Sequence, residues 1–349
     1  MKVKDALKKI RIRREDVERS LILCAAAMVV ALALQQNLTG REKAASDDGA
    51  QLPVTAVTAA PTDTRPTVVY YQSGEGYLVP VTCRVENQDG IAKATLKKLV
   101  SSGQNDLAAA RLGLLTTIPE GTQIDLDISG GRARVDLSKE ALACRDAEAE
   151  NAMIQSIVET LCQWDTVETV DFLFDGQKRS KLTYGSDVSG AFSGGHVNFE
   201  SAETVATAGA GTVELYFPSA SGRMLVPVTR TVYSASDVTT AMLELCKGPR
   251  PDSGLNAPLP PDCGLKGVTM KNGVVTVNFS KEFAQALTGE AGDTALKAVY
   301  FTAMQFPGVK DVRLQIDGQD YTPAGDAVST SLNLDSDIVS YFPGVVETD

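Results

Sequence analysis

Few residues of this chain could carry out acid–base or metal chemistry, and their positions do not favour it. Its one histidine, His196, lies in a stretch rich in Gly and Ser. Histidine is the most frequent general base and metal ligand, but a working site needs a rigid scaffold to hold it. We therefore interpret His196 as a solvated linker residue.

Two pairs of carboxylates could in principle hold a cation or act together as acid and base. These are Asp125 with Asp127, and Asp146 with Glu148. Asp125 and Asp127 alternate with apolar residues, which is the pattern of a strand with one face in water. The sequence predicts a solvated sheet face here rather than a catalytic pair.

A Ser-Lys-Glu triplet occurs twice, at Ser138–Glu140 and at Ser280–Glu282. A serine nucleophile activated by lysine needs both side chains on one side of the backbone, whereas neighbours on an extended segment point to opposite faces. A serine that ends a strand and caps the following helix or turn explains the triplet better. The chain also lacks GxSxG, HExxH, Walker and GxGxxG patterns. We predict no catalytic residue, no cofactor and no metal site, and hence no enzyme.

An internal repeat accounts for most of the chain. The segment Thr67–Thr82 (TVVYYQSGEGYLVPVT) resembles Thr212–Thr229 (TVELYFPSASGRMLVPVT), with the same ending. Downstream, Val135–Glu140 matches Val277–Glu282, and Asp-Gly pairs follow both at the same spacing. This spacing is typical of a duplicated domain and too long for a short tandem array.

Hydrophobic periodicity gives both repeats the same order of elements. In the first repeat we expect strands at 67–71, 77–82, 123–128, 133–137 and 167–174, with helices at 89–101 and 148–163. In the second we expect strands at 213–217, 224–229, 267–270, 274–279 and 309–316, with helices at 237–247 and 293–305. The predicted fold class is α+β, two tandem ββαββαβ domains, each a sheet with helices gathered on one face. Trp164 and Phe306 end equivalent helices, where core or capping contact is expected rather than stacking on a ligand.

The cysteines do not form a shared framework. Cys83, Cys144, Cys162, Cys246 and Cys263 occupy non-equivalent positions of the two repeats, so we interpret them as small buried hydrophobes. The chain has no CxxC spacing for a metal. A Cys246–Cys263 bridge across a Pro-rich loop remains open.

The N-terminal region predicts a membrane segment. Residues 1–20 are rich in Lys and Arg and precede an uncharged, mostly apolar stretch at 21–39. This pattern predicts a signal anchor, and a cleavable signal peptide is the open alternative. Lipidation is not expected, because Cys24 begins the apolar run instead of ending it.

The remaining boundaries follow from composition. We expect a flexible tether at 40–64, the first domain at 65–186, a Gly- and Ser-rich link at 187–210, the second domain at 211–325 and a tail at 326–349. The link should be mobile unless the domains dock. With 349 residues, 43% of them hydrophobic, the chain can bury a core in each repeat. Its net charge of −11 argues against nucleic-acid binding.

The second repeat resembles the GerM domain, the module of sporulation and spore germination proteins. The resemblance rests on LYFPSASGRMLVPVTR (215–230), LCKGP (245–249), APLPPDCGLKGVTMKNGVVTVNFSKEF (257–283) and FPGVKDVRLQIDG (306–318). The first repeat is a divergent copy that keeps YY, LVPVT, IPEGT, VDLSKE and the closing DG. Membership of the GerM family with tandem domains is therefore expected.

The resemblance implies a non-enzymatic envelope protein of endospore formers. It implies domains similar to ring-building modules of secretion systems, with self-association and contact with other sporulation envelope proteins. The expected location is the cell membrane, with the domains in the space between mother cell and forespore, as part of a channel. An open alternative is a monomeric envelope binding or sensor module with a ligand site between the domains. An enzyme acting on cell-wall material ranks third.

Overall fold

The computed structural model describes residues 64–86, 90–200, 210–261, 263–287 and 289–321, all within one compact unit that starts at Pro61. The predicted leader, membrane segment and tail lie outside these residues, as does the tether except for Thr64. Within the part described, the structure contains no helix long and apolar enough to cross a membrane.

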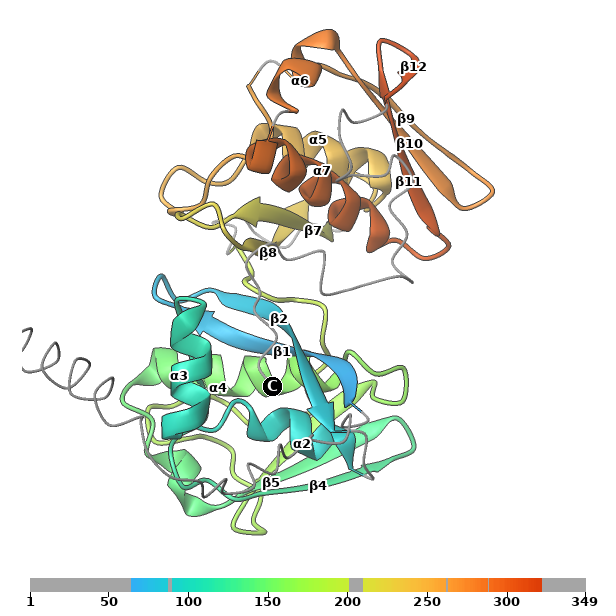
Figure 1. The fold of residues 1–349 in the computed structure, drawn as a ribbon. Helices are drawn as coiled ribbons and strands as arrows, with labels where there is room; N and C mark the ends of the chain where they lie inside the picture. The colour runs from blue at the N-terminus through green and yellow to red at the C-terminus, as the bar shows by residue number, and fades with distance from the viewer. Residues whose placement is uncertain (1–63, 87–89, 201–209, 262, 288, 322–349) are drawn as a thin grey trace, which may run out of the picture. The chain divides into compact units, whose positions relative to one another are not determined.

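The first repeat begins with a hairpin and continues through helices into a second sheet (Figure 1). Its elements are β1 (Thr64–Ser73), β2 (Leu78–Glu86), α2 (Ile91–Lys97), α3 (Gly103–Arg111), β3 (Leu114–Leu115), β4 (Ile124–Ser129), β5 (Arg132–Leu137), the 3₁₀ helix η2 (Lys139–Leu142), α4 (Ala147–Leu161) and β6 (Thr169–Phe174). Strands β2, β1 and β3 form one sheet, and β4, β5 and β6 form another. In the second sheet β5 and β6 run parallel, with α4 as the crossover between them.

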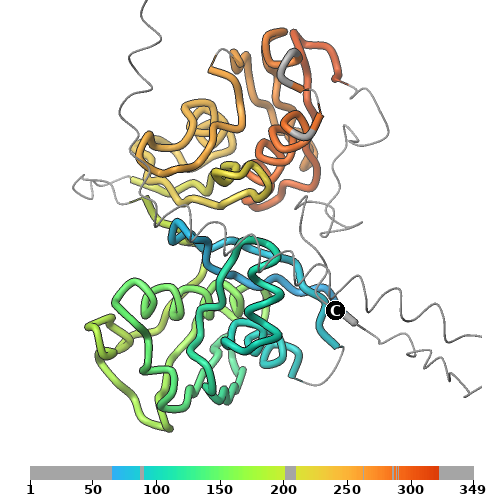
Figure 2. Tube along the Cα trace, turned by 60° about the vertical axis from the view of Figure 1, so that its left-hand side comes forward, coloured from blue at the N-terminus to red at the C-terminus, as the bar shows by residue number. Residues whose placement is uncertain are grey.

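The second repeat has the same plan. Its elements are β7 (Gly211–Pro218), β8 (Leu225–Val232), α5 (Val238–Lys247), β9 (Leu265–Lys271), β10 (Val274–Phe279), α6 (Lys281–Ala286), α7 (Gly289–Met304), β11 (Asp311–Ile316) and β12 (Gln319–Asp320). Strands β7 and β8 form the hairpin, and the other sheet has the order β12-β11-β10-β9. Strands β10 and β11 again run parallel, and the long helix α7 is the crossover between them. The duplicated ββαββαβ order is thus confirmed, with short additions in each copy, and Figure 2 shows each repeat as one continuous range of colour.

The expected single sheet with helices on one face is wrong. Each repeat has two sheets, and its long helices contact both: α4 touches β1 and β6, while α7 touches β7 and β11. The reason lies in the helices themselves. Met153, Ile157 and Leu161 are buried in α4, but so are Ile154 and Val158. Such a wide apolar surface needs cover on two sides.

Equivalent positions of the two repeats fill equivalent places in the core. Val135 and Val277 on the central parallel strands are fully buried, and Leu137 and Phe279 follow them. The β4–β5 hairpin turns through Gly130 and Gly131, whose φ angles of 56° and 77° favour glycine. The residues that repeat in the sequence therefore occupy the same core positions in both repeats.

One glutamine in each repeat closes the free edge of the first strand. Just beyond α4, Gln163 accepts a hydrogen bond from Val68 N (2.7 Å) and donates to Val68 O (2.6 Å). Beyond α7, Gln305 makes the same pair with Glu214 N (2.8 Å) and O (2.6 Å). Each glutamine also donates to a carbonyl oxygen of its own helix end. The side-chain amide thus stands in for a neighbouring strand.

A threonine one turn earlier completes the contact. Thr160 Oγ1 accepts from Tyr70 N at 3.1 Å, and Thr302 Oγ1 accepts from Tyr216 N at 3.3 Å. Both threonines are fully buried. Each long helix therefore satisfies two backbone N–H groups of the strand edge, which would otherwise be open to pairing with another chain.

We predict that Gln163→Ala lowers the free energy of unfolding by about 2–4 kcal/mol, because it leaves the N–H and C=O of Val68 without partners. The matched control is Gln155→Ala on the exposed face of α4, which should change stability by less than about 0.5 kcal/mol. Urea unfolding of both variants measures the difference. Equal free energies of unfolding for Gln163→Ala and Gln155→Ala would show that Gln163 does not hold the strand edge.

Candidate functional site

The structure gives separate places and partners to the residues that the sequence singled out. His196 is exposed, as expected for a linker residue. Asp125 and Asp127 lie on the exposed face of β4, where Asp125 pairs with Lys93 at 3.1 Å. The prediction of a solvated sheet face is confirmed.

Asp146 and Glu148 have separate structural roles. Asp146 is the N-cap of α4 and accepts from Ala149 N at 2.7 Å. Glu148 is exposed and accepts from the Gln72 side chain at 3.5 Å. Among the residues described, no three His, Cys, Asp or Glu side chains gather as a metal would require.

The repeated serines occupy the predicted places but not the predicted role. Ser138 and Ser280 are N-cap residues of η2 and α6, yet neither hydroxyl accepts a hydrogen bond from a backbone N–H of its helix. Ser138 Oγ donates to Glu140 at 2.6 Å, and Ser280 Oγ donates to Cys263 O at 3.1 Å. Both serines hold the N-cap positions, but the predicted side-chain cap is absent. Ser138 Oγ accepts instead from Gln123 N at 2.9 Å. Trp164 and Phe306 pack against the core, as predicted.

The most elaborate polar contacts lie on the link, which sequence analysis treated as mobile unless the domains dock. Glu159 on α4 accepts from the backbone N–H groups of Gly195 (3.1 Å) and His196 (3.4 Å). The link approaches α4 so closely that a Cβ at Gly194 would lie 2.6 Å from Cys162 Cβ. Glycine is therefore required there.

Asn198 joins the two LVPVT strands. Its Oδ1 accepts from Leu78 N at 2.8 Å, and its Nδ2 donates to Leu78 O and to Pro227 O, both at 2.7 Å. The residue adopts φ 49°, a left-handed conformation that asparagine tolerates better than most residues. One amide thus binds β2 of the first repeat and β8 of the second.

The link then runs beside β8. Thr229 donates to Val197 O through its backbone N (3.1 Å) and its hydroxyl (2.8 Å), and Glu200 N donates to Thr229 O at 2.8 Å. Residues 194–200 therefore make specific contacts with both repeats. This is the docked case, for which the sequence did not predict a mobile link. Residues 201–209 lie outside the described part.

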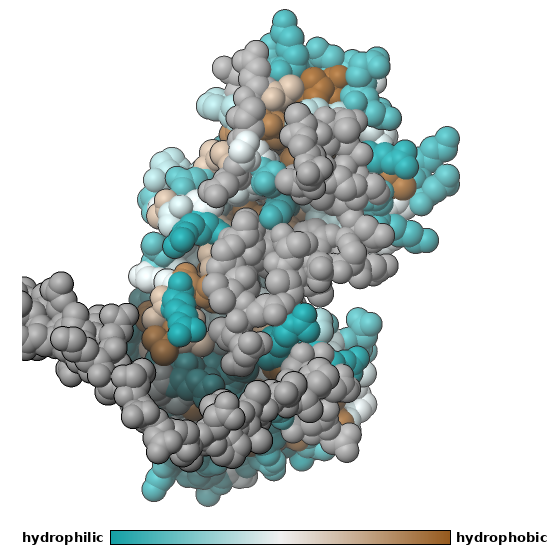
Figure 3. Space-filling view, in the orientation of Figure 1, coloured by the Kyte–Doolittle hydropathy of each residue, from teal (hydrophilic) through white to brown (hydrophobic). Residues whose placement is uncertain are grey.

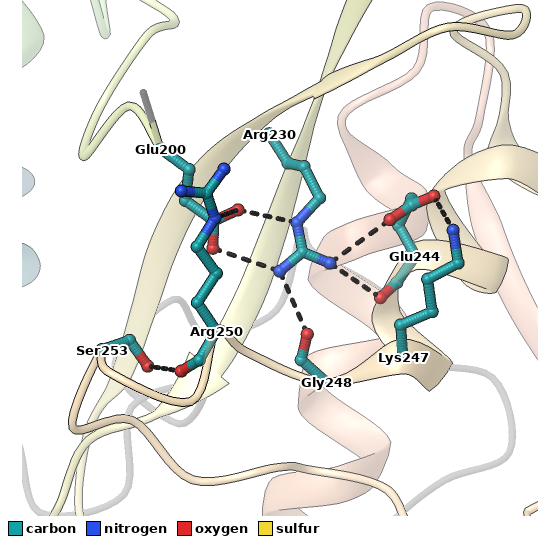
Figure 4. A network of polar contacts seen from close by, with 7 residues as sticks. All are labelled: Glu200, Arg230, Glu244, Lys247, Gly248, Arg250 and Ser253. Carbon is teal, nitrogen blue, oxygen red and sulfur yellow. Dashed lines mark hydrogen bonds and ion pairs between the residues drawn. The ribbon is translucent and has the colours of Figure 1, made fainter. Parts of the chain in front are cut away.

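Arg230 anchors the end of this segment (Figure 4). Its guanidinium donates to both oxygens of Glu200, at 2.8 and 3.1 Å. It also donates to the backbone and carboxylate of Glu244 and to Gly248 O, at 3.0–3.3 Å. Arg250 reaches Glu200 at 3.4 Å, and Lys247 pairs with Glu244. The planar fork of arginine suits this many-sided contact.

Burial makes the Arg230 contact strong. The side chains of Arg230 and Glu200 are only 12% and 9% exposed, and Arg230 also lies 5.6 Å from the centre of the Phe217 ring. Removing one partner of a buried pair leaves the other charge uncompensated. In the first repeat Cys83 holds the position after LVPVT, so this anchor belongs to the second repeat.

A cavity of about 420 Å³ lies where the link passes between the repeats. Its lining includes Tyr70, Glu159, Glu168, Gly194 and Glu214. The Tyr216 hydroxyl donates to Glu214 at 2.6 Å. Two largely buried carboxylates, one from each repeat, therefore face one space.

Both carboxylates hold their protons more tightly than usual. Burial raises the pKa of Glu214, and the charge of Glu159 raises it further, while the Tyr216 hydroxyl opposes the shift. Burial likewise raises the pKa of Glu159, against the two N–H groups of the link. Ionisation of this pair at neutral pH thus costs stability.

Sequence reasoning missed the residues that order the link. Asn198, Glu200 and Arg230 carry no catalytic pattern, and their partners are far away in sequence. The one available signal was Arg230, which replaces cysteine directly after an otherwise identical LVPVT.

Together the fold and the link define a protein of two duplicated α+β domains, whose polar side chains fix one domain to the next. A family profile described as sporulation and spore germination (Germane) matches residues 68–180 and 214–322, more than half of the chain. The chain belongs to this family, the GerM family.

A relative and a solved structure are similar to this chain. The spore germination protein GerM of Bacillus subtilis (strain 168) is 26% identical over 264 residues, which cover 72% of this chain and 71% of the relative. The solved tandem GerMN domains of the sporulation protein GerM from Bacillus subtilis match with a TM-score of 0.64 and 24% identity. That match covers 81% of this chain and 99% of the solved one, and it shows the shared fold.

We predict that Arg230→Ala lowers the free energy of unfolding by about 3 kcal/mol, because Glu200 and Glu244 lose their buried cation. It should also speed amide hydrogen exchange at Glu200, whose N–H bonds to Thr229 O. Arg223→Ala, at an exposed arginine of the same repeat, is the control and should leave both quantities near wild type. Unchanged exchange at Glu200 in Arg230→Ala would contradict the anchor.

We predict that Glu214→Gln stabilises the protein at pH 7, because it removes a buried charge while its amide oxygen still accepts from Tyr216. The pKa of Glu214 is higher in the folded protein than in the unfolded chain. Wild type therefore loses stability as the pH rises from the unfolded-state pKa toward the folded-state pKa. The advantage of the variant should therefore shrink as pH falls toward the usual value of 4.5.

Urea unfolding at several pH values measures this difference, with Glu120→Gln at an exposed site as the control. A difference between Glu214→Gln and wild type that does not depend on pH would refute the assignment.

Proposed function

We propose that this protein is a non-enzymatic structural component of sporulation or germination, which works by assembling into a ring or scaffold. Family membership supports the sporulation role. The contacts of the link support the proposed assembly. Asn198 binds both repeats and Arg230 holds Glu200, so the two domains act as one building unit.

A unit of this kind suits head-to-tail assembly. Rings arise when unlike surfaces of identical subunits meet and the rotation closes. The two repeats share a fold but differ in surface residues, so opposite ends of the unit present unlike faces. Their edges differ too, since the second sheet ends in β6 in the first repeat, whereas in the second repeat β12 extends it beyond the equivalent strand β11.

The visible surface fits a protein that meets partners through limited contacts. In Figure 3 hydrophobic residues form separate small patches among hydrophilic ones on the described part. Exposed large apolar side chains are scattered over both repeats, for example Leu107, Tyr233, Leu243 and Met270. We place the domains outside the cytoplasm, tethered by the apolar segment at 21–39, with other sporulation envelope proteins as partners.

A second candidate function is a binding or sensor module. The cavity of about 420 Å³ at the link favours it, because residues of both repeats line it. Its acidic lining suits a small cationic or hydrogen-bond-donating ligand. Ligand binding would then adjust the angle between the domains.

We predict that residues 35–349 form assemblies of discrete mass in light scattering across concentration, alone or with candidate envelope proteins. Arg230→Ala should reduce the assembled fraction, because a loosened link no longer fixes the angle that closes a ring. Arg223→Ala should assemble like wild type. A wild-type protein that stays monomeric under every condition would overturn the ring and favour the binding module.

A further inference from the structure

The loop between α5 and β9 joins the two repeats through its own contacts. Gly248 O accepts from Arg230, Arg250 pairs with Glu200, and Ser253 O accepts from the Tyr77 hydroxyl of the first repeat at 2.9 Å. Whatever fixes this loop therefore also fixes the link.

Two cysteines stand at the ends of the loop. Cys246 lies in the last turn of α5, and Cys263 lies just before β9. Their Sγ atoms are 3.5 Å apart. We propose that Cys246 and Cys263 are an oxidation site, where a disulfide locks the loop and, through it, the junction of the two repeats.

The backbone at Cys246 and at Cys263 is already fixed by hydrogen bonds. Cys246 belongs to a helix, while Cys263 N donates to Pro260 O and Cys263 O accepts from Ser280 N. A disulfide needs Sγ atoms about 2.05 Å apart. Rotation of the two side chains can supply most of the remaining approach, so no element has to move far.

The chemistry requires an external disulfide such as oxidised glutathione. The Cys246 thiolate attacks one sulfur of the reagent and displaces the first thiol. The Cys263 thiolate then attacks Cys246 Sγ, forms the Sγ–Sγ bond and displaces the second thiol. The two protons lost by the cysteines end on the two released thiols, and the reagent accepts two electrons.

Access decides how this bond forms. Cys246 is partly buried and Cys263 is 2% exposed, so the reagent reaches Cys246 first. The hydrogen bond with Cys263, together with burial, raises the pKa of the Cys246 thiol. Oxidation of the folded protein is therefore slow, and the bond forms mainly as the chain folds in an oxidising compartment.

In the cell this oxidation rests on the extracytoplasmic location proposed above, but its chemistry can be tested apart from any assembly. The full chain is refolded with and without a glutathione redox couple, unfolded, alkylated and digested. Cleavage after Lys247 places the two cysteines on separate peptides. We expect these two peptides to be recovered linked in the oxidised sample alone.

The bond should also raise the midpoint of thermal unfolding by roughly 5–10 °C, because it closes a loop of fewer than twenty residues. Cys246→Ala should abolish this rise, while Cys144→Ala, which removes another buried cysteine, should keep it. Full alkylation of Cys246 and Cys263 after oxidative refolding would overturn the proposal. So would the recovery of either cysteine linked to a different one. Failure to form rings, by contrast, would bear on the scaffold and leave this result untouched.

Discussion

The pairing of one glutamine with one strand edge is the contact on which each repeat depends. A two-stranded hairpin is marginal by itself in water, and even in the first repeat β3 pairs with β1 only at Gln72 and Ser73. The rest of the first strand would expose unpaired N–H and C=O groups. Gln163 and Gln305 supply the missing partners from the ends of the long helices. Because each helix is also the crossover of the second sheet, the same contact joins both sheets into one domain.

The link follows from this arrangement. Fixing the end of α4 against β1 also fixes Glu159, one turn before Gln163, in front of the link backbone. On the other side, Glu214 N and O are held by Gln305, so the Glu214 side chain is fixed beside the cavity. The contact that builds each domain therefore also sets the two carboxylates between which the link passes. Burial is the main cause of the raised pKa of each carboxylate, and the charge of Glu159 raises the pKa of Glu214 further.

Local pattern predicted the elements well and their assembly less well. Alternation and helical periodicity gave the repeated ββαββαβ order, and spacing gave the duplication, because both depend on near neighbours in sequence. The division into two sheets depends on which strands meet after folding, and only the wide apolar surface of α4 hinted at it. Gln163 and Asn198 escaped notice because their partners, such as Val68 and Leu78, lie about a hundred residues away. The role of the Ser138 hydroxyl could not be predicted, because the N–H that it binds, that of Gln123, is brought to it by the pairing of β4 with β5.

The two repeats diverge at residues that hold the link. Residues kept in both copies, such as Gln163 with Gln305 and Val135 with Val277, serve the interior. Arg230 is not kept, since Cys83 takes its place in the first repeat and turns its sulfur toward the Tyr71 hydroxyl, in the core. Two identical domains with identical faces would gain nothing from a fixed link, because any contact made by one would compete with the same contact of the other. The link contacts both repeats, but its buried ion pair lies on the second repeat alone, and this asymmetry suits the head-to-tail assembly proposed above.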